Sequence, residues 1–395
     1  MLIPTIILGW WAISWARGVA KWSEKADEFP TIAELRGPAI PDAENAALVY
    51  QQAWEALELT DEQQELLRQT EDPEKLAPIL EANSEALRLL HEAAGMERCR
   101  FPTDRSLAGL ASFPRMLDLR KLERLSGARA RYRSAQGDVA GALADINTLV
   151  ATAAHLLEAS ENYMLWISGR IPTGIASDAM EKLCSTHNPT GEQSRALRQS
   201  LLTMEPREGF VRMLKFEYRW TGQYARHRAP ELPFGLDQIP LVLDTARRTR
   251  MMTRLLKRAE TPYWQHVGRA PIGDPGGDLW DVHISVLEDG ILRRDEWVAM
   301  KHQAILALDI EAFIVEHGTP PPSLDELPAS DEADYALDPF SGERLRYKPG
   351  ESGGYTLWSI GRDLDDDGGI SRVEAREAGR ESGDYDLVFR VEPAD

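Results

Sequence analysis

The sequence predicts a mainly α-helical protein, a helical bundle followed by a small α+β domain with a short antiparallel sheet. Apolar residues recur at helical spacing over residues 45–267. A run rich in glycine and proline at residues 268–278 then interrupts this pattern. Beyond it, one more helical stretch is followed by three short strand-like segments that Gly, Pro and Asp residues separate.

These features divide the chain into five segments. We expect a membrane anchor or signal-like segment at residues 1–20, a connector at 21–44, a helical domain at 45–267, a linker at 268–290 and an α+β domain at 291–395. The connector is punctuated by prolines, which favours an extended path.

The N-terminal segment is apolar. Residues 2–16 carry no charge, and Trp10, Trp11 and Trp15 have the character of aromatic residues at membrane interfaces. A membrane-spanning helix takes about 20 apolar residues, so this run is short unless residues 18–20 extend it. We favour a membrane anchor.

Two other interpretations of this segment stay open. One is a signal sequence that is cut after the small residues Ser14 and Ala16, although no basic residues precede it. The other is an apolar helix packed on the body. If the segment is an anchor, Arg17, Lys21 and Lys25 behind it predict a cytoplasmic body by the positive-inside rule.

The composition excludes one class of partner. The chain has 45 Lys and Arg against 64 Asp and Glu, a net charge of −19, and such a field repels the phosphates of nucleic acids. Its two cysteines, Cys99 and Cys184, are too few for a disulfide framework or a zinc site with paired spacing. They form either one bridge or two unpaired buried thiols.

The first part of the helical domain predicts successive helices at residues 46–59, 61–71, 73–94 and 113–135, with a loop at 99–104. Small residues around a Gly-Asp turn at residues 128–157 then indicate a helical hairpin of the tetratricopeptide type, in a single copy. We therefore expect repeat-like packing without a solenoid. Further helices are expected at residues 190–204, 208–226 and 241–259.

The α+β domain begins with an expected helix at residues 293–317. Short strands are expected at residues 345–347, 355–358 and 387–391.

The strongest chemical motif lies between the last two strands. Asp363, Asp365, Asp367 and Glu374 occupy positions 1, 3, 5 and 12 of a twelve-residue calcium loop, and Gly368 occupies position 6, where the turn is sharp. Calcium prefers about six to eight oxygen ligands, which these carboxylates supply in part. The alternative is a solvated acidic loop that binds no ion.

The last quarter of the chain, residues 300–395, resembles the globular head of the type II secretion major pseudopilins. The matching segments are a helix end at Gly318, a Pro-x-Ser-Leu-x-x-Leu run at 321–327, an Asp-Pro-aromatic turn at 338–342 and an acidic turn at 383–386. In that family a calcium ion ties the loop after the strand to the acidic turn. The resemblance implies Asp363 as the best-supported ligand, with Asp384 or Asp386 from the far side.

The chain departs from that family in lacking the methylated pilin N-terminus and its hydrophobic shaft, so fibre assembly is not implied. The anchor, connector and helical middle together resemble uncharacterised planctomycete-type membrane-anchored proteins. A strand precedes the acidic loop and only one such loop is present, whereas calcium sensors use helix pairs. We therefore expect a structural calcium ion.

A weak structural site fills only where calcium is abundant, with a dissociation constant of about 10⁻⁴–10⁻³ M in extracellular modules. This favours an extracytoplasmic body, while the bases behind the anchor favour the opposite, so the topology stays open. His91-Glu92 lacks the second histidine of a zinc-protease helix, and the chain has no nucleophile elbow, phosphate-binding loop or dinucleotide fingerprint.

We therefore expect no catalytic residues, and a non-enzymatic membrane-anchored protein that scaffolds or binds protein partners at the cell envelope. The alternatives are a hydrolase with an unrecognised carboxylate site in the helical domain and an accessory component of a type II secretion-like apparatus.

Overall fold

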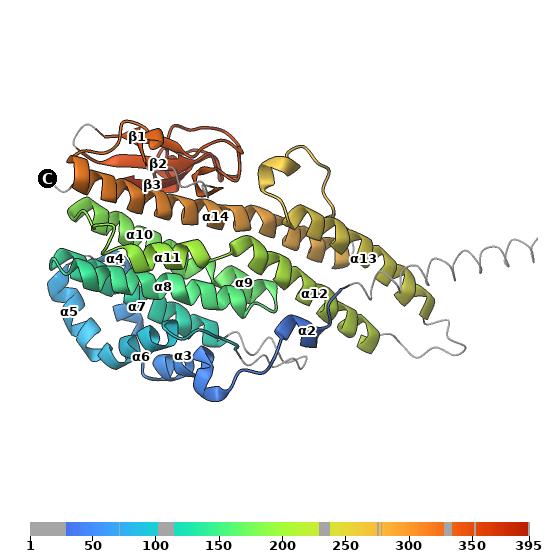
Figure 1. Ribbon diagram of the computed structural model, residues 1–395. Coiled ribbons are helices and arrows are strands. Elements are labelled where there is room, and N and C mark those ends of the chain that lie inside the picture. The colour runs from blue at the N-terminus through green and yellow to red at the C-terminus, as the bar shows by residue number, and fades with distance from the viewer. Residues whose placement is uncertain are drawn as a thin grey trace, which may run out of the picture.

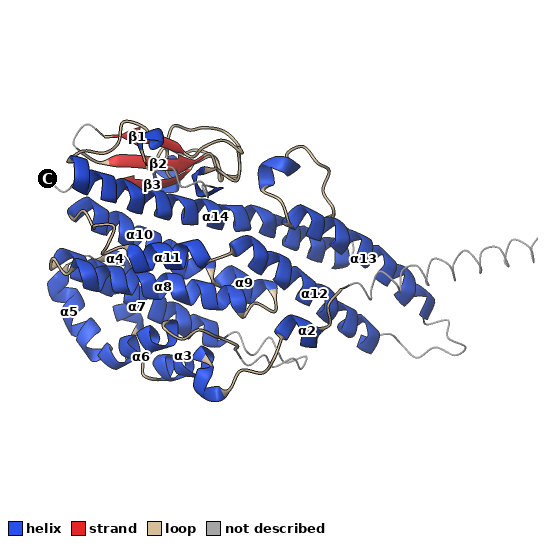
Figure 2. Cartoon of the chain, in the orientation of Figure 1, coloured by secondary structure: helices blue, strands red, loops and turns tan. Residues whose placement is uncertain are grey.

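The computed structural model describes residues 29–70, 72–101, 114–228, 238–274, 276–277, 279–327, 334–350 and 353–393 (Figure 1). Within these residues the protein is mainly helical and carries one small antiparallel sheet, which confirms the predicted class at this level (Figure 2). The predicted anchor at residues 1–20 lies outside the described residues.

The bounds of the helices are α2 (Ile32–Arg36), α3 (Ala46–Glu55), α4 (Asp61–Gln69), α5 (Pro73–Ala82), α6 (Ser84–Ala94), α7 (Pro114–Ala135), α8 (Val139–Glu158), α9 (Tyr163–Ser168), α10 (Arg170–Thr186), α11 (Arg195–Thr203), α12 (Pro206–Arg228), α13 (Gln238–Ala259), α14 (Leu279–His317) and α15 (Arg372–Glu377). Helices α9 and α10 lie between two expected helices, where no separate helix is predicted. Side-chain caps start several of them. Thr60 and Gln63 form a capping box on α4, and Asp72 caps α5, whose first residue is Pro73. Part of the predicted connector is helical, because Thr31 and Glu34 form a capping box on α2.

The stretch predicted as one helix at residues 73–94 is two helices, α5 and α6. The break lies at Asn83, which is fully buried. Its side-chain amide donates to the carbonyl oxygens of Ile79 and Glu58, and its Oδ1 accepts from the backbone nitrogen of Glu58 at 2.8 Å. A short polar side chain that bonds nearby backbone groups competes with the helix, so Asn83 ends α5.

Helices α7 and α8 form the predicted hairpin around the Gly-Asp turn. Gly137 has φ 76°, a conformation that favours glycine, and Asp138 caps α8 through the backbone nitrogen of Gly141. Arg129 and Arg133 both donate to the buried carboxylate of Asp145 and hold the two helices together. A repeat relation between this hairpin and other helix pairs stays a prediction.

Among the described residues, α8 is long and apolar enough to cross a bilayer by length and composition. However, 61% of its apolar window is buried inside the protein, where α8 packs against α7, α10 and α11. A helix whose apolar surface is already covered in this way is typical of a protein core.

Helix α14 corrects the predicted boundary at residues 268–290. It begins at Leu279, inside the predicted linker, and continues unbroken for 39 residues. Buried apolar residues line both of its halves, among them Ile284, Ile291, Trp297 and Ile310. Because its first half packs on α12 and α13 and its second half on α10, α11 and the sheet, the helical part and the C-terminal head share one helix (Figure 1).

The sheet is an antiparallel meander of β1 (Arg346–Pro349), β2 (Tyr355–Ser359) and β3 (Leu387–Val391), with β2 in the centre. These are the three strands that the sequence predicts, shifted by a residue or two. Tyr355, Leu357 and Ser359 alternate toward the buried face, as a strand with one covered face requires. Gln303 of α14 donates to the carbonyl oxygen of Leu387 at 2.6 Å and so ties the sheet to the helix.

One buried apolar cluster extends from α8 and α10 through α14 to the sheet, and two smaller clusters lie around α3–α7. Cys99 and Cys184 are both buried and unpaired with each other. Of the two alternatives for these residues, two buried thiols is therefore correct.

Candidate metal site

The acidic loop connects β2 to α15, and its backbone turns sharply. Gly368 has φ 72°, although no atom lies within 4 Å of where its Cβ would be. Its backbone conformation, and not a lack of space, therefore requires glycine here, as the calcium-loop pattern predicts. Leu364 also has a positive φ, 66°, which is uncommon for a residue with a side chain.

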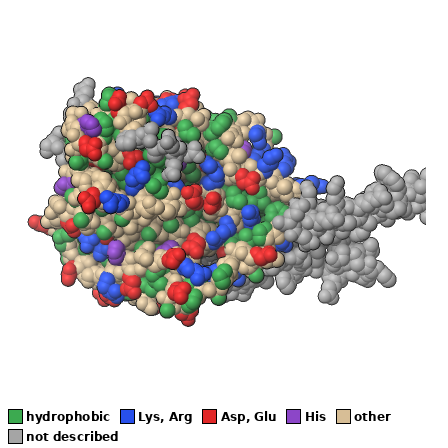
Figure 3. All heavy atoms as spheres, viewed as in Figure 1, with side chains coloured by type: hydrophobic (Ala, Val, Ile, Leu, Met, Phe, Trp, Pro, Cys, Tyr) green, Lys and Arg blue, Asp and Glu red, His purple; other side chains and the backbone are tan. Residues whose placement is uncertain are grey.

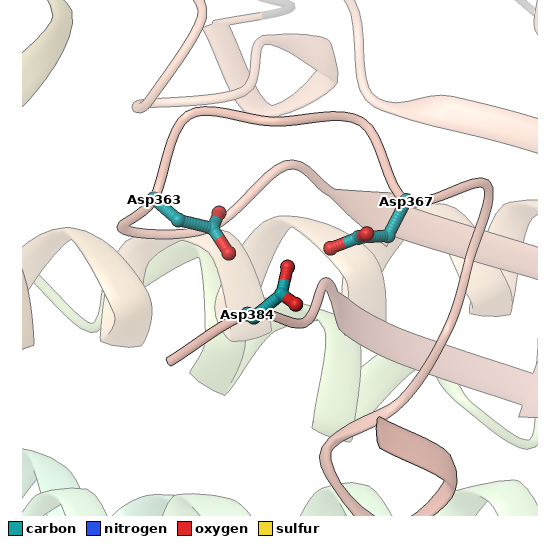
Figure 4. A group of neighbouring side chains, drawn as sticks. All are labelled: Asp363, Asp367 and Asp384. Carbon is teal, nitrogen blue, oxygen red and sulfur yellow. The ribbon is translucent and has the colours of Figure 1, made fainter. Parts of the chain in front are cut away.

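Three carboxylates meet inside this loop. Asp363 follows β2, Asp367 lies in the middle of the loop, and Asp384 comes from the turn before β3 (Figure 4). One oxygen from each lies within 4.8 Å of the other two. Two ligands of one calcium ion, each about 2.4 Å from it, lie at most about 4.8 Å apart, so the spacing of these oxygens falls within the range for a shared ion.

Asp363 fixes the relation between the loop and the acidic turn. Its Oδ2 accepts a hydrogen bond from the backbone nitrogen of Tyr385 at 3.1 Å. Its Oδ1 accepts one from the backbone nitrogen of Asp365 at 3.4 Å. Burial, and to a lesser degree the charge of Asp367, raises the pKa of the Asp363 carboxyl. A nearby cation would relieve both effects.

Asp386 adds a buried carboxylate behind the cluster. Its side chain is 1% exposed, and its Oδ2 accepts from the backbone nitrogen of Gly369 at 2.7 Å. Its Oδ1 and Oδ2 of Asp367 are both buried, and neither has a hydrogen-bond partner among the described residues. Burial and then the charges of Asp367 and Asp366 raise the pKa of Asp386 to about 6. Buried carboxylate oxygens normally have partners, and a hard cation satisfies such oxygens.

A guanidinium also reaches this cluster. Arg380 donates to Oδ1 of Asp367, and its Nη1 lies 3.5 Å from Oδ1 of Asp384. It therefore supplies a positive charge to two of the three clustered carboxylates. The sequence gives a partial signal for this residue, because Arg380 and Asp384 have the i, i+4 spacing of an ion pair.

Two of the predicted ligands lie elsewhere. Glu374 forms a capping box with Ser371 at the start of α15 and accepts from Arg390 at 2.7 Å. Hydrogen bonds from Arg390 and Ser371 lower the pKa of Glu374 to about 2. Asp365 is exposed, and its Oδ1 accepts from the backbone nitrogen of Asp366. The structure thus brings together Asp363, Asp367 and Asp384, with Asp386 behind them.

The loop is also tied to the helical part of the protein. Arg362, the residue before Asp363, donates to Glu296 of α14 from Nε at 2.9 Å. Glu296 is buried, and its other oxygen lies 2.7 Å from Arg170 of α10. Sequence reasoning missed this bridge, because the three residues are far apart along the chain.

Among the described residues, two hollows outside the loop contain charged side chains. A groove of about 980 Å³ runs between α2, α8 and α12, with Glu158 and Arg212 among its charged residues. A smaller recess of about 400 Å³ lies between α10 and β3 and contains Asp178 and Glu181. Burial, and then the charge of Asp178, raises the pKa of Glu181 to about 8, and burial also raises the pKa of Asp178.

Comparisons with known proteins give no relative: no family model matches the chain, and neither a curated protein nor a solved structure is similar enough to match it. The resemblance to pseudopilin heads and to planctomycete-type anchored proteins therefore stays a prediction.

Proposed function

We propose that this protein is a non-enzymatic scaffold or partner-binding protein of the cell envelope, anchored by its N-terminal segment, whose C-terminal head is held together by a calcium ion. The ion binds Asp363 and Asp367 of the loop and Asp384 of the acidic turn. The ion joins the loop before α15 to the turn between α15 and β3, so its role is structural.

One observation carries the calcium part of this proposal. Three carboxylates converge within 4.8 Å, and buried oxygens of Asp367 and Asp386 beside them find no hydrogen-bond partner in the described part of the chain. All these donors are oxygens, which suit hard cations such as calcium and magnesium better than zinc or copper. This arrangement supports a structural ion that ties the loop to the acidic turn over a helix-paired calcium-sensor loop that uses Glu374.

Calcium is expected to stabilise the full-length protein against thermal unfolding. With a dissociation constant of about 10⁻⁴–10⁻³ M, calcium at a hundredfold excess over that constant raises the free energy of unfolding by about 2.7 kcal/mol. Calorimetric titration measures the affinity and a melting curve measures the stabilisation. No heat of binding and an unchanged melting temperature at about 10–100 mM calcium, the hundredfold excess over that constant, would contradict the proposal.

Two variants separate this site from a calcium-sensor loop. Asp384→Asn is expected to abolish the calcium response, because Asp384 is one of the three clustered carboxylates. Glu374→Gln is expected to keep it, because that side chain is engaged with Ser371 and Arg390. The opposite pattern, in which only Glu374→Gln abolishes the calcium response, would show that the loop binds the ion as the twelve-residue loop of a calcium sensor does.

Replacing Arg380 by glutamine is expected to tighten calcium binding about two- to fivefold. The guanidinium and the ion use the same carboxylates, Asp367 and Asp384, so removing the guanidinium leaves both to the ion. The measurement is the calcium affinity by titration calorimetry. Arg376→Gln is the matched control, since it removes an exposed base of α15 one turn away. An equal gain in both variants would mean that only net charge matters.

The envelope part of the proposal is supported by the apolar N-terminal run at residues 2–16 and by the missing catalytic motifs. Co-purification with pseudopilins would instead favour the accessory role in a secretion apparatus.

A hydrolase is the second candidate, and the recess between α10 and β3 is the observation that favours it. Asp178 and Glu181 are adjacent carboxyls with raised pKa values, and such pairs serve as acid and base in hydrolytic enzymes. Hydrolysis of an ester, glycoside or phosphate test substrate that is lost in Glu181→Gln and kept in Asp363→Asn would establish it.

A further inference from the structure

One segment of this acidic chain is strongly basic. Residues 245–259 contain six lysines and arginines and no acidic residue, in a protein with a net charge of −19. The segment forms the C-terminal two-thirds of α13. Its apolar residues Met251, Met252, Leu255 and Leu256 are buried against the rest of the protein. Of the six bases, Arg248 is also buried, whereas Arg250, Arg254 and Lys257 are exposed on the other side of the helix.

Three of these bases form one exposed line, which we name the basic stripe: Arg250, Arg254 and Lys257. Their spacing of four and three residues places them on the same face of α13. None of the three is in an ion pair with a described residue, whereas their neighbours Arg247 and Arg258 are held by Asp281 and Glu288 of α14. In Figure 3, basic side chains gather at this end of the molecule.

The basic stripe lies close to the place where the chain enters the described structure. Phe29 packs on Tyr218 of α12 with ring centroids 4.4 Å apart, and Arg248 of α13 lies 5.2 Å from the centre of the same Tyr218 ring. Arg219 donates to the carbonyl oxygen of Pro30 at 2.9 Å and also to that of Phe29. The first described residues are thus fixed on α12, one helix away from the stripe.

The N-terminal segment limits how far this end of the protein can lie from a membrane. Thirteen peptide units separate Ala16, the end of the apolar run, from Phe29, and they span at most about 45 Å when fully extended. If residues 2–16 sit in a bilayer, α13 stays within reach of its surface. Attraction between the stripe and lipid phosphates acts within a Debye length of about 10 Å, so it favours direct contact.

We infer that the basic stripe of α13 docks on the anionic headgroups of the membrane that holds the N-terminal segment. Arginine suits this role, because its planar guanidinium donates two parallel hydrogen bonds to a phosphate. The contact orients the body, with α12 and α13 toward the lipid. It goes beyond the proposed calcium-stapled scaffold and does not depend on the calcium site.

The test uses full-length protein carrying an environment-sensitive fluorophore at Thr253→Cys. Thr253 is exposed between the stripe residues, while Cys99 and Cys184 are buried and escape labelling. The protein is mixed with vesicles of equal parts phosphatidylglycerol and phosphatidylcholine, or of phosphatidylcholine alone. We expect a blue shift of the emission only with the anionic vesicles, and its reversal when salt is added.

The triple variant Arg250→Gln/Arg254→Gln/Lys257→Gln is expected to weaken this docking about a hundredfold, since each base near an anionic surface contributes roughly a factor of five. The control Arg68→Gln/Lys75→Gln/Arg88→Gln removes the same charge from exposed positions on α4, α5 and α6 and is expected to dock like the wild type. Equal docking of the wild type and the stripe variant, or an equal shift on neutral vesicles, would overturn the inference.

Cosedimentation with neutral vesicles distinguishes docking of the basic stripe from attachment through the N-terminal segment. It reports attachment through residues 2–16, which the stripe variant leaves intact. If the protein fails to cosediment with neutral vesicles but still shifts on anionic ones, the anchor is wrong and the stripe stands.

Discussion

Replacing Arg294 by methionine is expected to lower the free energy of unfolding by about 3–5 kcal/mol. Arg294 and Asp295 are both fully buried on α14, and the guanidinium donates to the two carboxylate oxygens at 2.8 and 2.7 Å. Arg294 also donates to the carbonyl oxygens of Ala259 and Thr261, at the point where the chain leaves α13. Methionine leaves the buried Asp295 carboxylate without a paired positive charge, with the backbone nitrogen of Tyr263 as its remaining donor, and it leaves the two carbonyls without the guanidinium.

Chemical denaturation of the full-length protein measures this loss. Arg293→Met is the matched control, because the adjacent Arg293 pairs with Asp289 at a partly exposed position and is expected to cost no more than about 1 kcal/mol. The double variant Arg294→Met/Asp295→Leu should recover part of the loss, since the unpaired charge is then gone. Equal losses at Arg293 and Arg294 would show that the buried pair contributes nothing specific.

Protonation of Glu311 is expected to make the protein more stable at pH 5 than at pH 8 by about 2–3 kcal/mol. Glu311 is fully buried between α10, α14 and β2. Its carboxyl accepts from the Tyr355 hydroxyl and from the Asn188 amide, both at 2.9 Å. Burial raises the pKa of Glu311 from 4.5 to about 7. Between these values the folded protein binds a proton that the unfolded chain has lost, so stability falls as the pH rises.

Other buried carboxyls with raised pKa values, such as Asp386 and Glu181, also make the protein less stable as the pH rises. The contribution of Glu311 is therefore measured as the difference between the wild type and a variant without this carboxyl. The pH dependence of the unfolding free energy is compared between the wild type and Glu311→Gln, which is expected to lose about 2–3 kcal/mol of the change from pH 5 to pH 8. Glu316→Gln removes an exposed carboxyl from the end of the same helix as a control. A wild-type slope in Glu311→Gln would disprove the assignment.

The helical periodicity and the turn residues predict the helical bundle, the α7–α8 hairpin and all three strands. They fail at the boundary, because the Gly-Pro run at residues 268–278 ends just before α14 begins at Leu279. Glycine and proline indicate where a helix is interrupted but not how soon the next one starts. The break between α5 and α6 at Asn83 could not be predicted from the sequence either, because it depends on a contact with Glu58, which is distant in the sequence.

The candidate site was predictable in part. The spacing of Asp363 and Asp367 identifies the loop, and the resemblance to pseudopilin heads supplies Asp384. The twelve-residue template assigns Glu374 wrongly to the cluster, because it assumes that the last residue turns back to the ion. Here Ser371 and Arg390 hold that side chain at the start of α15. Contacts such as Arg362 with Glu296 depend on the tertiary fold and leave no pattern in the sequence.

Because α14 is continuous, its length fixes the rotation of the C-terminal head about the helix axis relative to the helical body. Each residue of an α-helix turns the chain by about 100° and advances it by about 1.5 Å, so the 39 residues extend over about 58 Å. One residue inserted between the two halves would swing the sheet about a quarter turn away from α10, while three or four would nearly restore its direction. The head is therefore not an interchangeable module: between the body and the sheet, α14 can change length only by about whole helical turns.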